Sequence, residues 1–150
     1  MRLSPNFDLE ELTLSETGER HGIRNTPNDE QVKQLERLCR LILQPLRDDV
    51  KQFVVITSGF RNDKVNRLVG GAYNSYHLEG RAADIRVPGL TPLAVCLRIK
   101  ALRLPYDELI HEYQSWCHVA VAAREDAPRR REMTATKVHG LTHYQPGLNS

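Results

Sequence analysis

Three side chains with metal-binding chemistry lie in two strand-like stretches of the sequence. His77 and Asp84 are seven residues apart on either side of Gly80, and His118 lies inside an alternating stretch at residues 116–121. Neutral imidazole and carboxylate groups suit zinc, and three protein ligands leave the fourth position of a tetrahedral site open for water. The two histidines and the aspartate therefore predict a catalytic zinc site.

The local pattern explains how these residues can meet. Residues 82–87 alternate between apolar side chains that face the core and a second set, including Asp84, that faces the other side. A turn at Gly80 followed by this strand can bring Asp84 back to His77. His118 lies on the polar face of its own strand, because the residues on either side of it are apolar. The spacing alone also fits histidines that are merely hydrogen-bonded, with no metal.

Two helices, a first strand and a hairpin are predicted to hold these pieces. Thr26 is a good N-cap, and apolar residues at spacings of three and four predict an amphipathic helix up to about Arg47, with a kink at Pro45. Short helical pieces are expected over residues 4–25, with Asp8 capping the first. The other predicted elements are a buried strand at residues 53–58, a helix at residues 92–102, and a hairpin with strands at residues 106–113 and 116–122.

The composition is that of an ordinary folded domain. The chain has 150 residues, of which 40% are hydrophobic and 27% charged, and its net charge is +2. The apolar pattern stops after Ala123, so we expect one domain at residues 1–123 and a poorly ordered tail at residues 124–150. The basic run at residues 129–131 lacks interleaved aromatic side chains, which favours a solvated tail over nucleic-acid binding. We interpret His139 and His143 in the same tail as non-functional rather than as a second metal site.

Cysteine usage and hydropathy bear on the compartment. Cys39, Cys96 and Cys117 lie in apolar patterns and form no CxxC motif, which favours three small buried side chains in a protein that folds in a reducing cytosol. The sequence has no recognisable signal peptide and no apolar stretch of transmembrane length. We therefore expect a protein that is made in the cytoplasm and does not insert into a membrane.

Five motifs follow one another in the chain: Ser58-Gly59-Phe60-Arg61, Val69-Gly70-Gly71, Ser75-x-His77-x-x-Gly80-x-Ala82-x-Asp84, Asp107-Glu108-Leu109-Ile110-x-Glu112 and Trp116-x-His118-Val119. Together they resemble the zinc D-Ala-D-Ala carboxypeptidase family, and more narrowly its small phage- and prophage-encoded murein peptidases. The resemblance covers roughly residues 5–122. It implies a small α+β domain in which a mostly antiparallel sheet carries the zinc site and helices pack on the other face.

The resemblance also assigns roles. It implies that His77, Asp84 and His118 bind Zn²⁺ and that Arg61 lies near the substrate or the developing oxyanion. Ser75 is expected either to contact the substrate or to fix the loop that carries the first histidine. The implied partner is a peptidoglycan stem peptide with a bond involving D-alanine, cut by a monomeric carboxypeptidase or endopeptidase. Such a protein would reach the cell wall after release from the cell or as part of a phage particle.

The general base is where the sequence departs from the family, because many relatives carry Glu or Asp three residues before the last histidine, where this chain has Ser115. The nearest carboxylate is Glu112. A two-residue hairpin loop would turn Glu112 to the core and place His111 beside His118, whereas a three-residue loop would put Glu112 on the face of His118. Burying an unpaired carboxylate is unfavourable, which favours the longer loop and Glu112 as base. His111 is then the fallback, as a site histidine or, with the longer loop, as a solvent-facing residue.

The serine at position 115, where many relatives carry a carboxylate, supports a second functional hypothesis. A domain that keeps zinc but lacks a competent base could serve as a wall-binding or virion structural module without catalysis. Turnover of purified peptidoglycan by the wild type, compared with Glu112→Gln, separates the two hypotheses.

Overall fold

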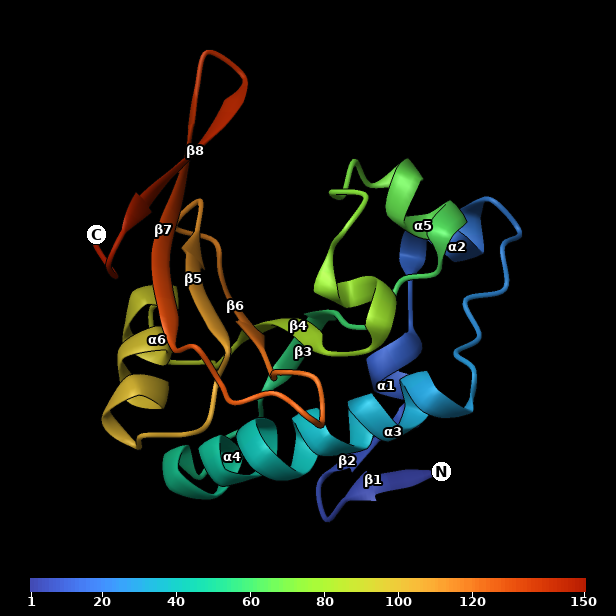
Figure 1. Ribbon diagram of the computed structural model, residues 1–150, viewed down its shortest axis with the longest axis horizontal. Coiled ribbons are helices and arrows are strands. Elements are labelled where there is room, and N and C mark those ends of the chain that lie inside the picture. The colour runs from blue at the N-terminus through green and yellow to red at the C-terminus, as the bar shows by residue number, and fades with distance from the viewer.

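A six-stranded sheet organises the chain, with the strand order β3-β4-β6-β5-β7-β8, in a computed structural model that describes residues 1–150 (Figure 1). Neighbouring strands are antiparallel except β5 and β7, which are parallel. Together with the helices, this sheet confirms the predicted α+β class. The strands are β3 (Val55–Ser58), β4 (Ala82–Arg86), β5 (Glu108–Glu112), β6 (Trp116–Ala120), β7 (Arg131–Val138) and β8 (Leu141–Pro146).

The helices flank the sheet, and α3, α4 and α6 pack on one of its faces (Figure 1). A small second sheet near the N-terminus pairs β1 (Arg2–Ser4) with β2 (Phe7–Asp8). None of the helices combines the length and the apolar character that crossing a bilayer requires. The helices are α1 (Leu9–Thr13), α2 (Glu16–Arg20), α3 (Asp29–Leu38), α4 (Gln44–Val50), α5 (Asp63–Leu68) and α6 (Pro92–Ala101), with a π-helical turn η1 (Cys39–Leu43) and a 3-10 turn η2 (Tyr76–Glu79).

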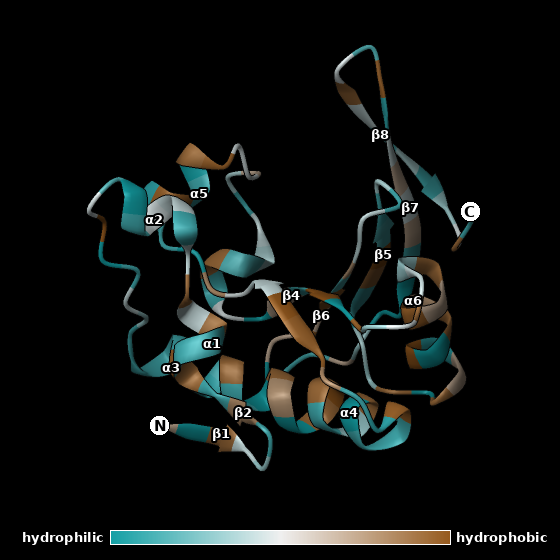
Figure 2. Ribbon diagram, turned by 180° about the vertical axis from the view of Figure 1, so that it is seen from behind, coloured by the Kyte–Doolittle hydropathy of each residue, from teal (hydrophilic) through white to brown (hydrophobic).

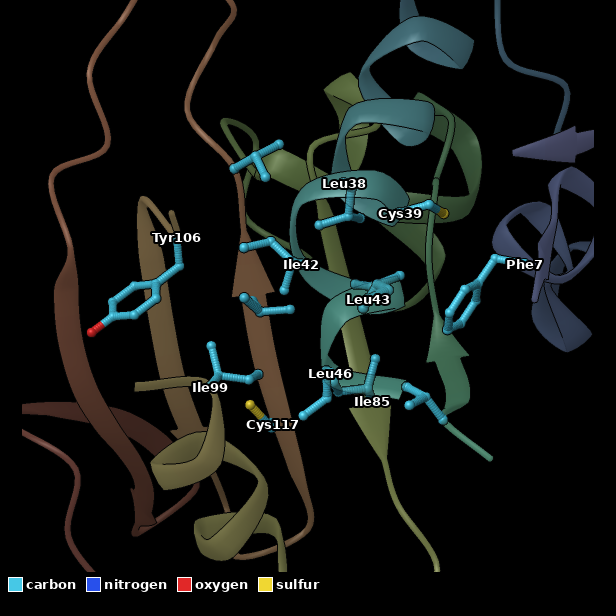
Figure 3. Close-up of a cluster of buried hydrophobic side chains, with 14 of the residues drawn as sticks. Phe7, Leu38, Cys39, Ile42, Leu43, Leu46, Ile85, Ile99, Tyr106 and Cys117 are labelled. Atoms are coloured by element: carbon cyan, nitrogen blue, oxygen red, sulfur yellow. The ribbon is translucent and has the colours of Figure 1, made fainter. Parts of the chain in front are cut away.

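The hydrophobic core lies between the sheet and the long helical segment α3–η1–α4. Figure 3 shows its side chains, with those of the helical segment between Phe7 on one side and Ile99 and Cys117 on the other. Figure 2 shows hydrophobic segments gathered where this helical segment meets β4 and β6. Cys39, Cys96 and Cys117 are buried and unpaired, as expected. Because strands alternate, burying one face of β4, β5 and β6 in this core turns their polar residues to the opposite face.

The long helix differs in detail from the prediction. Its N-cap is Asn28 rather than Thr26, because the Asn28 side chain accepts from the Gln31 backbone N–H and forms a capping box. Before Pro45, where a kink is expected, the helix widens into a π-helical turn in which the Gln44 N–H bonds to the Cys39 carbonyl. A proline ring would clash with the carbonyl four residues earlier, and the wider turn relieves this clash. The helix then continues to Val50.

The C-terminal segment corrects a second expectation. Residues 131–146 are not a poorly ordered tail, because they form β7 and β8 and extend the main sheet beyond β5. Thr134 and Ala135 are buried in this arrangement. Arg129, from the predicted solvated run, donates to both carboxylate oxygens of the buried Asp107 and so ties the start of β7 to β5.

Candidate metal centre

Strand pairing brings the predicted ligands together. In the antiparallel register of β4 and β6, Asp84 lies directly opposite His118. His77 approaches from the turn η2, which ends at Gly80 in the left-handed region with φ of 75°. One ligand atom from each of the three residues lies within 4.8 Å of the other two, and all three side chains are buried. This His–Asp–His group is the one candidate metal site of the structure.

Each histidine uses one ring nitrogen for a protein contact and turns the other toward Asp84. His77 Nδ1 donates to the Gly59 carbonyl at 2.7 Å, and its Nε2 lies 3.3 Å from Asp84 Oδ1. His118 Nε2 donates to Glu108 Oε1 at 2.9 Å, and its Nδ1 lies 3.0 Å from Asp84 Oδ1. Metal-binding histidines are typically oriented by such a carbonyl or carboxylate on the second nitrogen. The donor set therefore fits a metal ion held by His77 Nε2, His118 Nδ1 and Asp84.

The electrostatics of the group favour a cation. Burial opposes a charge on His118, but hydrogen bonds to Asp84 and Glu108 outweigh burial and raise its pKa to about 10. Burial likewise opposes ionisation of Asp84, but the two neighbouring imidazoles hold its pKa below the ordinary value. Burial lowers the pKa of His77. The same carboxylates that favour a proton on His118 would attract a metal cation in its place.

Ser75 and Gly80 shape the loop that carries His77. The Ser75 side chain caps η2 by accepting from the His77 backbone N–H at 3.2 Å. A Cβ on Gly80 would lie 2.6 Å from the Gln31 carbonyl oxygen, so a side chain there would collide with α3. Of the two roles considered for Ser75, these contacts favour fixing the loop, although Ser75 also lines the cleft.

Glu112 lies beside the metal group, as the longer hairpin loop requires. Glu112 pairs with Trp116, so the loop is Tyr113-Gln114-Ser115 and the predicted register is confirmed. Glu112 Oε1 accepts from Trp116 Nε1 at 3.2 Å and lies 3.6 Å from His118 Nδ1. Burial raises the pKa of the Glu112 carboxyl above its ordinary value.

His111 takes neither of the places considered for it. It lies on the opposite face of β5, it is buried, and its Nδ1 donates to the Asn149 carbonyl at 2.7 Å. The expectation of a solvent-facing residue is wrong because the C-terminal segment after β8 covers this face. His139 and His143 lie on the exposed β7–β8 hairpin, outside the metal group.

Arg61 reaches the site from the loop after β3. Its Nε is buried and makes no hydrogen bond within the protein, and its side chain lines the same cleft as the metal group. Burial lowers the pKa of its guanidinium, while the charges of Asp84 and Glu112 act in the opposite direction. A Cβ on Gly71 would lie 2.9 Å from Arg61 Nη1, so the glycine lets the loop close against this side chain. A buried donor without a protein partner is suited to a ligand oxygen.

The metal group opens into a cleft of about 1340 Å³. One wall carries Arg61 and the loop at residues 69–77, and the opposite wall is formed by the β5–β6 loop and the β7–β8 hairpin. Glu108 also lines this cleft, although sequence reasoning assigned it no role. The sequence does contain an indication of its position, because Glu108 precedes Glu112 by four residues and therefore lies on the same face of β5.

A buried His–Asp–His group beside a carboxylate, open to a cleft, is typical of a metal-dependent hydrolase. Comparison with known families agrees: the Peptidase M15 family model matches residues 5–120, and the chain belongs to this family. The protein is therefore a metallopeptidase of a family associated with peptidoglycan-type substrates. No curated protein gives a significant match to the sequence.

Proposed function

We propose that the protein is a zinc-dependent peptidase that hydrolyses a peptidoglycan stem-peptide bond involving D-alanine, as a carboxypeptidase or endopeptidase. The observation that carries this proposal is the convergence of His77 Nε2, His118 Nδ1 and Asp84 next to the buried Glu112. Membership of the M15 family supports the reaction class. Bound zinc would lower the pKa of a water molecule and polarise the scissile carbonyl.

The protein groups around the metal position have separate tasks in this proposal. The Gly59 carbonyl and Glu108 hold the two histidines in the tautomers that leave His77 Nε2 and His118 Nδ1 free for the metal. Among the carboxylates beside the metal ligands, Glu112 is then the one available for proton transfer. Glu112, at the end of β5, would take the role of the carboxylate that many relatives carry at the position of Ser115.

Glu112 would act as the general base and then as the general acid. Burial raises the pKa of this carboxyl toward neutral pH, which favours taking a proton from the attacking water and returning it to the leaving amine. The Trp116 indole N–H holds the same carboxyl in place. Arg61 would donate to the carbonyl oxygen as negative charge develops on it, or to a substrate carboxylate.

Two substitutions test this proposal on purified peptidoglycan and on stem peptides ending in D-Ala-D-Ala. His118→Ala should abolish both zinc retention and cleavage, whereas Glu112→Gln should keep zinc and lose cleavage by at least about a hundredfold. His143→Ala, on the exposed strand β8, is the control and should change neither. Full cleavage by a metal-free variant would refute zinc catalysis. A wild type that retains zinc but releases no product would instead favour the non-catalytic wall-binding or virion module.

A further inference from the structure

The β7–β8 hairpin forms a wall of the cleft, although it lies outside the residues matched by the family model. We propose that this hairpin is a second substrate subsite, in which Lys137 binds a carboxylate that the peptide carries some residues away from the scissile bond. The inference rests on the proposed function and deepens it. It names the class of stem peptide that the cleft would prefer.

Strand register places the hairpin side chains on the catalytic face. Glu112 lies opposite Ala135 of β7, and Ala135 lies opposite Tyr144 of β8. Lys137 is two positions beyond Ala135, so its side chain shares the face of Glu112, and Lys137 and Tyr144 both line the cleft.

Lys137 is the uncommitted cation of this wall. The other basic residue there, Arg131, lies 4.0 Å from Glu108 Oε2, whereas Lys137 makes no ion pair. Its Nζ lies 5.5 Å from the centre of the Tyr113 ring, which holds the ammonium group over the cleft. A substrate carboxylate would therefore meet an available positive charge without first displacing a protein carboxylate.

The wall is anchored well enough to act as a binding surface. The Tyr113 backbone N–H donates to the Ala135 carbonyl at 2.9 Å, and the Tyr113 and Thr142 hydroxyls are 2.9 Å apart. At the base of the hairpin, the buried Thr134 hydroxyl donates to the Gly147 carbonyl at 2.8 Å. These bonds join the hairpin to the β5–β6 loop and to its own C-terminal end.

Sheet geometry sets the distance between the two parts of the cleft. Met133 lies level with Ile110 and hence with His118, and Lys137 lies four positions further along β7, about 13 Å away. Crossing from β6 to β7 adds about 10 Å laterally, so the Cα atoms of His118 and Lys137 are separated by roughly 16 Å. An extended peptide covers about 3.3 Å per residue, and side chains shorten the path, so the carboxylate would lie about three to four residues from the bond.

The test uses two stem pentapeptides that end in D-Ala-D-Ala and differ at one group. One carries D-glutamate at its second position, and the other carries D-isoglutamine, which replaces the α-carboxylate with a carboxamide. Binding is measured by calorimetry with zinc and the Glu112→Gln variant, which prevents turnover. Lys137→Gln, Lys137→Arg and the control Lys64→Gln, on the exposed surface of α5, are each added to this background.

We expect the acidic peptide to bind about fivefold more tightly than the amide, a ratio that corresponds to an ion pair worth about 1 kcal/mol. Lys137→Gln should abolish this preference, whereas Lys137→Arg and Lys64→Gln should keep it. Any of three results would overturn the inference. The two peptides could bind equally well to the protein that retains Lys137, the preference could survive Lys137→Gln, or neither peptide could bind. Turnover by the wild type tests the proposed function separately, because this binding measurement needs no cleavage.

Discussion

Glu108 offers a sharp test of how the centre is built, because its contact with the metal group runs through His118 alone. Its carboxylate accepts from His118 Nε2 at 2.9 Å and should fix the ring so that Nδ1 points to the metal position. Glu108→Gln keeps an acceptor but removes the charge, and Glu108→Ala removes both. We therefore expect zinc affinity to fall in the order wild type, Glu108→Gln, Glu108→Ala.

The size of the loss follows from the contact. A hydrogen bond to a charged group in a buried position is worth about 1.5–3 kcal/mol, and each 1.4 kcal/mol corresponds to about tenfold in affinity. Glu108→Ala should therefore weaken zinc binding by about 10- to 100-fold, the usual range for a residue behind a metal ligand. Glu108→Gln should weaken it by less, about three- to tenfold, because the amide oxygen can still accept the bond.

Competition with a chromophoric zinc chelator measures these affinities directly. Glu132→Gln is a matched control on β7, because Glu132 pairs with Lys100 and Tyr106 away from the metal group. Far-ultraviolet circular dichroism verifies that each variant is folded. Wild-type zinc affinity in a folded Glu108→Ala protein would refute the idea that this carboxylate orients the ligand.

Three further predictions concern the scaffold. Gly59→Ala would place a Cβ 2.2 Å from the Leu12 carbonyl oxygen, so we expect urea unfolding to show that the free energy of unfolding falls by about 1–3 kcal/mol. Zinc binding should also weaken, because the displaced Gly59 carbonyl orients His77. Unchanged stability would contradict the close contact. Thr134→Val removes a hydroxyl that bonds both Gly147 and Asn149, and should lower the free energy of unfolding by about 1–3 kcal/mol, whereas Thr136→Val, where no such bond exists, should change it little. Burial raises the pKa of the Cys39 thiol to about 12 and that of Cys117 well above its ordinary value, so neither should react with a disulfide reagent at pH 8 until the protein unfolds, and rapid labelling of the folded protein would show that the core is open.

Local sequence determined much of the metal group. A turn followed by an alternating strand brings Asp84 back to His77 within seven residues, and this requires only glycine at the turn and the pleat of the strand. The same alternation identified the face of His118. The unfavourable burial of a lone carboxylate favoured the longer hairpin loop, and this placed Glu112 on the face of His118, where the structure has it. The choice between the two loops could be made from the sequence because it depends only on residues close together in the chain.

Only the tertiary structure decided which distant surfaces meet. The contact of Glu108 with His118 depends on the pairing of β5 with β6, and the burial of His111 depends on a chain end 38 residues away. The addition of β7 to β5 is a parallel, non-local pairing, and β8 is exposed along its whole length, so neither strand carries the alternating pattern that marks a half-buried strand. The sequence thus determined the ligands, because their geometry is local. The tertiary structure decided their supporting carboxylate and the far wall of the cleft, because these depend on contacts between segments that the sequence keeps apart.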